Sequence, residues 1–215
     1  MKKRIICFGD SNTWGYNPIT CERYDENTRW TMRLQTLLGD DYQIIEEGQN
    51  GRTIACEDPW EWGIKKGMDY ALPMVESHRP FDLLIIMLGS NDLKKKFNLP
   101  AGDIAGSLKT MLMYLKSFMK YKCNINPKIL IVSPVHLGEH IGDSRFAEFF
   151  DGENAVANSK RLAFWYEEAA KQFGCEFFDA SAVAKAGDVD CLHMQEESHI
   201  ALAEAMAERV LQIIG

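Results

Sequence analysis

The chain has 215 residues, 46% of them hydrophobic, and a formal net charge of −7. This length suits one α/β domain over residues 1–215, and the acidic balance argues against a nucleic-acid or anionic-membrane surface. The six cysteines form no C-x-x-C pair, which excludes zinc ribbons and thioredoxin-like sites. The apolar run after Arg4 is too short for a signal peptide, and no run reaches membrane-spanning length. We therefore predict a cytoplasmic protein with reduced cysteines.

Short apolar runs alternate with helical patterns along the chain. Five of these runs are β-branched or aromatic and mostly unalternating, which is typical of parallel strands buried on both faces. They are residues 4–8, 43–46, 82–88, 128–133 and 175–179. Helices are predicted between and after them, at residues 28–38, 68–77, 104–118, 158–173 and 200–214. The alternation predicts an α/β fold, with an open parallel sheet of about five strands and helices on both faces.

Ser11 directly follows the first predicted strand, in the sequence Gly9-Asp10-Ser11-Asn12. A serine hydroxyl is a poor nucleophile until a neighbouring base takes its proton. A strand-to-helix turn would expose this hydroxyl, and Asp10 or Asn12 could hydrogen-bond the backbone of the turn. The alternative interpretation of Ser11 is an ordinary helix N-cap.

Asp190 and His193 stand three residues apart near the end of the chain. A histidine can accept and return a proton near neutral pH, and a carboxylate on its other ring nitrogen usually holds it in the right tautomer. One loop or helical turn could present both side chains together. Without Ser11, such a pair is more often solvated surface. Cys191 lies between them, and its apolar neighbour Leu192 favours an inert thiol.

Two further residues follow predicted strands and could donate hydrogen bonds to an oxyanion. Asn91 offers a side-chain amide, and Gly51 offers an unobstructed backbone N–H. The N–H of Ser11 is a third candidate. Fixed donors at a developing oxyanion are worth about 3 kcal/mol each in acyl transfer. The alternative for Asn91 and Gly51 is turn chemistry, since Asn and Gly are common in turns.

Two other kinds of motif, metal-binding and nucleotide-binding, would imply a different chemistry. The segment from His136 to His140 matches the H-x-x-E-H zinc-protease pattern. It follows a predicted strand and Pro134, and Gly138 weakens any helix there, so we predict no metal site. No nucleotide-binding glycine motif occurs. Residues 50–67 and 134–152 read as long loops rich in aromatics, and such loops either carry function or pin themselves to the core.

The candidate catalytic and oxyanion residues lie in four short sequence blocks: Gly9-Asp10-Ser11, Gly51, Gly89-Ser90-Asn91-Asp92 and Asp190-Cys191-Leu192-His193. Together these blocks resemble the SGNH/GDSL hydrolase superfamily, and the sequence around Ser11 is most similar to its arylesterase/acyltransferase branch. The resemblance spans nearly the whole chain and implies a flavodoxin-like three-layer α/β/α sandwich. It implies Ser11 as nucleophile, His193 as base and Asp190 as its orienting acid. The implied oxyanion donors are the N–H groups of Ser11 and Gly51 and the side chain of Asn91.

The sequence therefore predicts a serine esterase that cleaves short-chain, acetyl-type esters through an acyl-enzyme, without metal or cofactor. The predicted substrate pocket contains Asp10, Asn12, Trp14 and Leu192, with Trp14 narrowing the acyl site. The predicted partner is a small-molecule ester, with no nucleic acid and no membrane, and the resemblance is compatible with a homo-oligomer. The alternatives are a carbohydrate O-acetyl esterase, an acyltransferase to alcohols, and an inactive ligand-binding module on the same fold.

Overall fold

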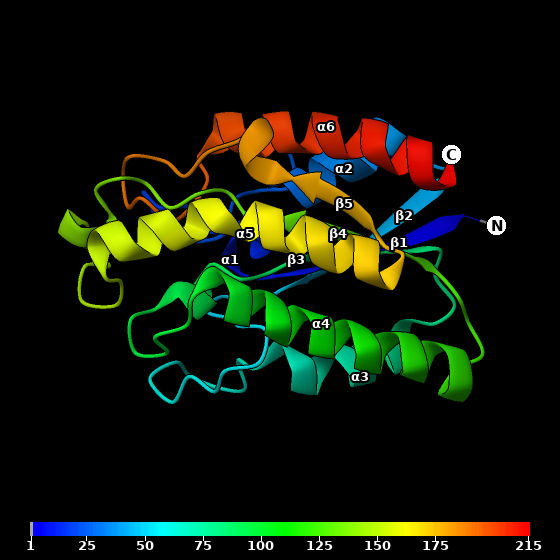
Figure 1. The fold of residues 1–215 in the computed structure, drawn as a ribbon. Coiled ribbons are helices and arrows are strands. Elements are labelled where there is room, and N and C mark those ends of the chain that lie inside the picture. The colour runs from blue at the N-terminus through cyan, green and yellow to red at the C-terminus, as the bar shows by residue number, and fades with distance from the viewer. Residues whose placement is uncertain (1) are drawn as a thin grey trace.

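A parallel sheet of five strands runs through the centre of the molecule (Figure 1). The computed structural model describes residues 2–215. The strands lie in the order β2-β1-β3-β4-β5, and every neighbouring pair is parallel. Their bounds are β1 (Lys3–Gly9), β2 (Tyr42–Gly48), β3 (Leu83–Met87), β4 (Lys128–Ser133) and β5 (Glu176–Asp179). Each strand overlaps one of the five predicted runs, so the predicted parallel sheet is confirmed.

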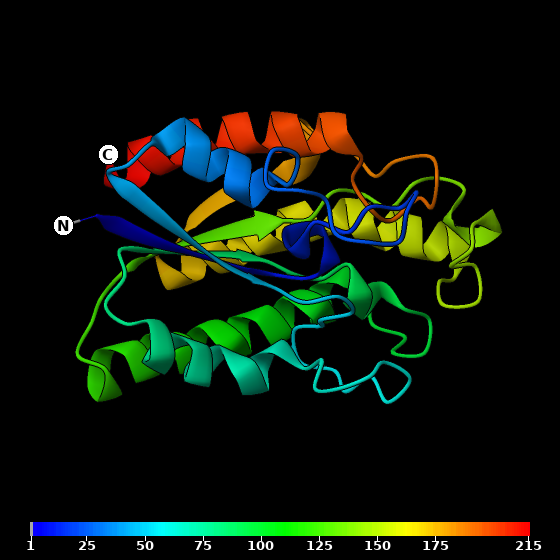
Figure 2. The same cartoon turned by 180° about the vertical axis from the view of Figure 1, so that it is seen from behind.

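Helices cover both faces of the sheet and complete the predicted α/β/α sandwich (Figures 1 and 2). On one face pack α2 (Trp30–Leu38) and α6 (Glu196–Ile214), and on the other α3 (Gly67–His78), α4 (Ala101–Ser117) and α5 (Gly152–Phe173). A single short helix, α1 (Ser11–Trp14), follows β1. The short 3₁₀ helices are η1 (Asn91–Leu93), η3 (Ile141–Asp143) and η4 (Ala180–Ala182), and the π-helical segment η2 (Phe118–Lys122) continues α4. No helix in the described part of the chain combines the length and the apolar character that crossing a bilayer requires.

The central strand β3 shows why the sequence lacks an alternating pattern in its strands. All of its residues are buried. Leu84 and Ile86 pack into the core beneath α3, α4 and α5, while Leu83 and Ile85 pack into the core beneath α2 and α6. A strand that is covered on both faces buries apolar area at every position, so selection for a polar face is absent.

The carboxyl ends of the strands meet at one edge of the sheet, where the predicted site residues follow them. Ser11 comes after β1, Gly51 after β2 and Asn91 after β3. Close packing at this edge requires glycine at position 9, because an added Cβ would lie 2.8 Å from the carbonyl oxygen of Met87 and would also strike Thr13. Ligands of open parallel sheets bind beyond this edge, so the topology delivers the candidate residues to the expected place.

Helix α5 begins at Gly152, earlier than the predicted start at residue 158. Its first turn carries a glycine and the polar Glu153 and Asn154, so the sequence there reads as loop. Ala155 and Val156 are nonetheless buried in the core shared with α4. Tertiary packing of these two side chains therefore extends the helix beyond the pattern visible in the sequence.

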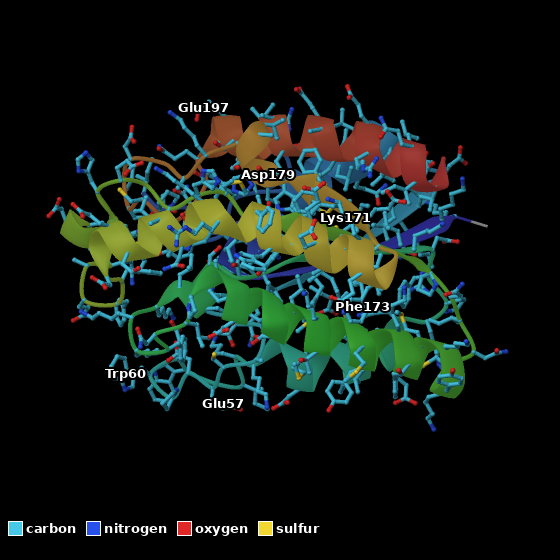
Figure 3. The ribbon with its side chains drawn as sticks, viewed as in Figure 1. Glu57, Trp60, Lys171, Phe173, Asp179 and Glu197 are labelled. Atoms are coloured by element: carbon cyan, nitrogen blue, oxygen red, sulfur yellow. The ribbon has the colours of Figure 1, made fainter. Side chains whose placement is uncertain are left out.

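The aromatic residues of the loop before α3 do not share one role. Trp60 points outward from the body of the molecule (Figure 3), with the Lys96 Nζ atom 4.4 Å from its ring centroid. Trp62 is 95% exposed. The expectation that aromatics pin this loop to the core is therefore wrong for these two tryptophans.

Candidate active site

Ser11 occupies the first position of α1, at the sharp turn out of β1. The residue before it, Asp10, is the N-cap, and its Oδ1 atom accepts a hydrogen bond from the Asn12 N–H at 3.0 Å. The N-cap interpretation of Ser11 is therefore wrong, because Asp10 supplies the capping side chain. This leaves the Ser11 hydroxyl free for another partner at the helix N-terminus.

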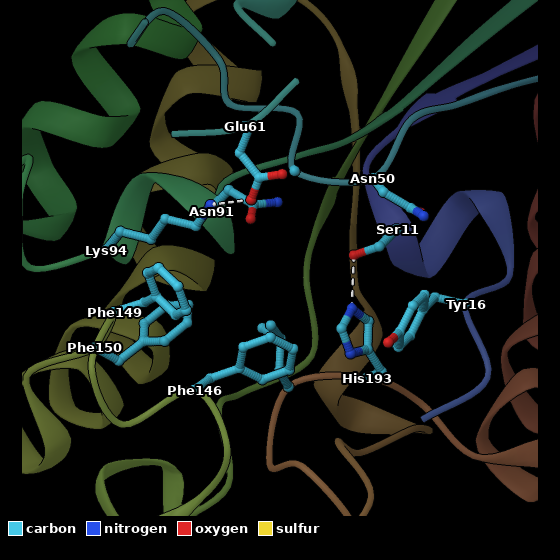
Figure 4. Close-up of a pocket in the computed structure, with 12 residues that line it drawn as sticks. Ser11, Tyr16, Asn50, Glu61, Asn91, Lys94, Phe146, Phe149, Phe150 and His193 are labelled. Carbon is cyan, nitrogen blue, oxygen red and sulfur yellow. Dashed lines mark hydrogen bonds and ion pairs between the residues drawn. The ribbon is translucent and has the colours of Figure 1, made fainter. Parts of the chain in front are cut away.

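That partner is His193, which reaches Ser11 from the loop before α6 (Figure 4). The His193 Nε2 atom lies 2.8 Å from Ser11 Oγ, although the two residues are 182 positions apart in sequence. The other ring nitrogen, Nδ1, lies 2.7 Å from Asp190 Oδ2. All three side chains are nearly or fully buried. The structure therefore brings a hydroxyl, an imidazole and a carboxylate into one continuous hydrogen-bonded chain.

Asp190 is held as a carboxylate in this chain. Burial alone would favour its neutral form, but the hydrogen bond and the charge of His193, together with two backbone N–H donors, lower the pKa of Asp190 to about 2. The donors are the N–H groups of Leu192 at 3.0 Å and His193 at 2.8 Å, both to Oδ1. The same residue spacing that suggested the pair thus closes a tight turn around the carboxylate.

The three candidate oxyanion donors line one cavity beside Ser11. Gly51 has φ of 78°, a left-handed conformation that glycine adopts without strain. The Asn91 Nδ2 atom donates to the Arg52 carbonyl at 3.1 Å, and its second hydrogen remains for a ligand in the cavity. The Ser11 N–H is among the first N–H groups of a helix, which have no acceptor within the helix.

The cavity has a volume of about 170 Å³ and two unlike walls (Figure 4). One wall is aromatic and the other is polar. The lining residues are Ser11, Tyr16, Asn50, Gly51, Glu61, Asn91, Lys94, Phe146, Phe149, Phe150, Leu192 and His193. The aromatic wall comes mainly from the loop between β4 and α5, and the Lys95 N–H holds it by donating to the Phe149 carbonyl at 2.8 Å.

Two rings of the aromatic wall contact the imidazole directly. The ring centroid of Tyr16 lies 4.3 Å from that of His193, and Phe146 meets the same ring edge-on at 5.7 Å. These contacts exclude water from most of the imidazole and restrict its rotation. Tyr16 is not among the residues predicted from the sequence, whereas Phe146 lies in the aromatic-rich loop that the sequence indicated.

Three of the four predicted pocket residues do not line the cavity, and only Leu192 does. Trp14 turns away from it and packs against Arg23, whose guanidinium carbon lies 5.4 Å from the ring centroid. The prediction that Trp14 narrows the acyl site is therefore wrong on geometry, and Tyr16, two residues later, stands beside the catalytic candidates instead.

Asp10 and Asn12 support the site from behind. The carboxylate of Asp10 is turned to the backbone of its own turn. The side chain of Asn12 bridges to the histidine loop, donating to the Leu192 carbonyl at 3.3 Å and accepting from the Met194 N–H at 2.9 Å. Asn12 thus ties the start of the chain to its end and fixes Ser11 relative to His193.

The polar wall contains a buried ion-pair cluster. The Lys94 Nζ atom lies 2.9 Å from both Asp58 Oδ2 and Glu61 Oε1, and Lys96 also pairs with Asp58. The Glu61 carboxylate lies against Gly51, where an added Cβ would meet Glu61 Cδ at 2.8 Å. The sequence gives no sign of this cluster, because Lys94 lies 36 positions from Asp58 and 33 from Glu61, and each charge by itself is typical of a solvated loop.

Asp92 lies beneath the polar wall and is fully buried. Both of its carboxylate oxygens accept from the Ile54 N–H, at 3.0 and 3.1 Å. Burial, reinforced by the nearby charge of Asp10, raises the pKa of Asp92 to about 7 even though that hydrogen bond opposes the shift. This carboxyl group connects η1, which carries Asn91, to the loop that carries Gly51.

The residues of the H-x-x-E-H segment do not form a metal site. The segment is not helical, His136 is partly buried, and the His140 side chain is 84% exposed with Asp143 as its neighbour. Across residues 2–215 no group of three or more His, Cys, Asp or Glu side chains is arranged to hold a metal ion.

Solved structures with the same architecture extend over the whole chain. The aryl esterase of M. smegmatis matches with a TM-score of 0.88 and 35% identity, covering 99% of this chain and 100% of that one. A carbohydrate acetylesterase family member from Sinorhizobium meliloti matches with a TM-score of 0.91 and 33% identity, covering 99% of each chain. No curated protein sequence matches significantly. The fold and these likenesses define the class as three-layer α/β ester hydrolases.

A sequence profile of the GDSL-like lipase/acylhydrolase family matches residues 7–199. The chain belongs to this family and is a carboxylic ester hydrolase. The resemblance drawn from the four sequence blocks is thereby confirmed.

Proposed function

We propose that the chain is a serine esterase in which Ser11, His193 and Asp190 form the catalytic triad. The observation that carries this proposal is the 2.8 Å contact between Ser11 Oγ and His193 Nε2, with Asp190 on the opposite ring nitrogen at 2.7 Å. A base within hydrogen-bond reach activates the serine, and a carboxylate on the other nitrogen fixes the tautomer.

The reaction proceeds in two halves. His193 takes the Ser11 proton as Oγ bonds to the ester carbonyl carbon, and the carbonyl electrons move onto the oxygen. The Ser11 and Gly51 N–H groups and the Asn91 amide stabilise this oxyanion. The carbon–oxygen bond to the alcohol then breaks, and the alcohol leaves with the proton from His193. Water repeats the sequence on the acyl-enzyme, with His193 again as base, and releases the acid and free Ser11.

The cavity supports small acyl or aryl groups as substrates. Its volume is about 170 Å³, and an engineered protein cavity of about 150 Å³ holds a benzene molecule. A long acyl chain would have to leave the cavity past its aromatic wall. We therefore propose short-chain esters, with aryl acetates as convenient representatives.

A second candidate is de-acetylation of carbohydrates. The polar wall presents the Glu61 carboxylate and the Asn91 amide opposite aromatic rings. A sugar would suit these two walls, because its hydroxyl groups can hydrogen-bond to the polar wall while its C–H groups pack against the aromatic wall. One of the similar structures carries the name carbohydrate acetylesterase. Comparing kcat/KM for phenyl acetate with that for acetylated monosaccharides distinguishes the candidates, because only the carbohydrate enzyme should prefer the sugar esters.

The decisive test is Ser11→Ala. We expect hydrolysis of p-nitrophenyl acetate to fall by about 10⁴-fold or more, with an unchanged circular dichroism spectrum. A fluorophosphonate probe should label the wild-type chain at Ser11 and leave the variant unlabelled. Labelling also separates an esterase from an inactive binding module, since only an activated serine reacts. Full turnover by Ser11→Ala would remove Ser11 from the mechanism.

Three further predictions concern acyl transfer, the oligomeric state and the cellular location. Acyl transfer requires an alcohol to replace water at the acyl-enzyme, and product analysis in water–alcohol mixtures measures it. Homo-oligomer formation is checked by sedimentation of the purified chain. The cytoplasmic location stays a prediction that cell fractionation tests.

A further inference from the structure

Arg145 approaches the triad from outside, on the loop between β4 and α5. Its Nη2 atom donates to Asp190 Oδ2 and to the Pro18 carbonyl, both at 2.9 Å, and its Nη1 atom donates to Cys21 Sγ at 3.3 Å. Its guanidinium carbon lies 5.3 Å from the Phe146 ring centroid. The side chain is 37% exposed, whereas Asp190 is fully buried. A partly exposed positive charge is thus hydrogen-bonded to a fully buried carboxylate.

The Asp190 carboxylate has no acceptor capacity to spare in this arrangement. Oδ1 accepts from two backbone N–H groups, those of Leu192 and His193, and Oδ2 accepts from His193 Nδ1 and from Arg145. A carboxylate offers about four lone-pair sites, and all are used. The two backbone bonds fix the rotamer of Asp190 without help from Arg145, so the arginine is not needed to hold the carboxylate in place.

What Arg145 adds is charge at the oxygen that also serves the imidazole. Nη2 lies 2.9 Å and His193 Nδ1 lies 2.7 Å from the same Oδ2 atom. Because both nitrogens bond to one oxygen atom, they lie close to each other. At so short a separation the positive charge of Arg145 disfavours protonation of the His193 imidazole. Asp190 stabilises the imidazolium form of His193, and Arg145 opposes it.

We infer that Arg145 acts on the triad through Asp190: its guanidinium shares the Asp190 carboxylate with His193 and favours the neutral imidazole that takes the serine proton. This inference rests on the proposed triad. Its consequence is that the enzyme stays active at lower pH than a triad without the arginine. Removing the charge should leave the site assembled. It should raise the pH at which kcat/KM falls on the acid side of its pH profile, called the acid limb below.

Other titratable groups surround the pair and have to be separated from Arg145. Beyond the triad, they are Asp10, Tyr16, Cys21, Tyr24, Cys191 and His199, with Glu61 and Lys94 across the cavity. Burial raises the pKa of Tyr16 to about 12 and lowers the pKa of His199 to about 3, so neither titrates near neutral pH. Cys21 requires a control, because its thiol accepts from Arg145 and its hydrogen bond with Tyr16 lowers its pKa.

The experiment is the pH profile of kcat/KM for p-nitrophenyl acetate in Arg145→Gln. We expect the acid limb to move up by about one pH unit. One unit below the wild-type midpoint, kcat/KM of the variant should then lie about 100-fold below its own plateau, whereas kcat/KM of the wild type lies about tenfold below its plateau. The plateau itself should change by less than about threefold. Arg145→Lys keeps the positive charge and should keep the limb near its wild-type position. If Arg145→Gln does not fold, Arg145→Met replaces it, since its apolar stem packs against Phe146 in a similar way.

Two matched controls accompany these variants. Arg161→Gln removes an exposed guanidinium on α5, away from the site, and Cys21→Ser removes the thiol that Arg145 also contacts; neither should move the acid limb. An acid limb unchanged in the neutral Arg145 variants, whatever their plateau, would overturn the inference. Failure of the esterase proposal itself would look different, because Ser11→Ala would then retain activity.

Discussion

Replacing Asp92 by asparagine should change how the stability of the protein depends on pH. Burial raises the pKa of Asp92 from 3.8 to about 7 in the native state. Between these two values the native state holds a proton that the unfolded state has released. The free energy of unfolding therefore falls as pH rises through this window, and the loss is complete above the native pKa.

The size of the effect follows from the two pKa values. For a single group, the shift from 3.8 to about 7 corresponds to a loss of about 2.5 kcal/mol between pH 5 and pH 8. An amide cannot ionise, so Asp92→Asn abolishes this loss. The variant also places a buried NH2 group where one of the two acceptors of the Ile54 N–H was, and a buried donor left without an acceptor costs about 1–3 kcal/mol, independently of pH. Relative to wild type, Asp92→Asn should thus be less stable at pH 5 and recover about 2.5 kcal/mol by pH 8.

Urea unfolding followed by tryptophan fluorescence at pH 5 and pH 8 measures this difference. Asp41→Asn is the matched control, because it makes the same substitution at an exposed position and should track the wild type at both pH values. If Asp92→Asn and wild type lose the same stability between pH 5 and pH 8, then Asp92 does not hold a proton in the native state, and the reasoning from burial is refuted.

Two predictions concern the cavity. Asn91→Ala should lower kcat by about 10²–10³-fold through loss of an oxyanion donor, and should lower the free energy of unfolding by about 1–3 kcal/mol because the Arg52 carbonyl loses its partner; a kcat within threefold of wild type would exclude Asn91 from the oxyanion hole. Phe146→Ala should raise KM for p-nitrophenyl acetate about tenfold, the equivalent of about 1.5 kcal/mol of apolar contact, whereas Trp14→Phe should leave KM nearly unchanged. The reverse ranking would place the acyl site beside Trp14.

The sequence determined the fold because its signals are local. The run 83–88 is apolar at every position, and this pattern is typical of strands covered on both faces. The turn after β1 could be predicted for the same reason, since Gly9, the last residue of the strand, lies only two positions before Ser11. Asp190 and His193 could be paired by spacing alone, and the structure closes their turn with backbone N–H groups of the same short segment.

Tertiary structure decided everything that depends on residues distant in sequence. The choice of Tyr16 over Trp14 beside His193 depends on where α1 ends, and Gly15 ends it in a left-handed conformation. The ion pairs of Lys94 join two loops that no periodicity connects.

Arg145 shows the same limit for the triad itself. An arginine in a loop sequence carries no sign of the carboxylate that it will meet 45 positions later. Side-chain direction and desolvation arise only when the sheet and its helices bring separate segments together. For this reason the candidate catalytic residues could be predicted from the sequence. The charges around them and the shape of the cavity could not.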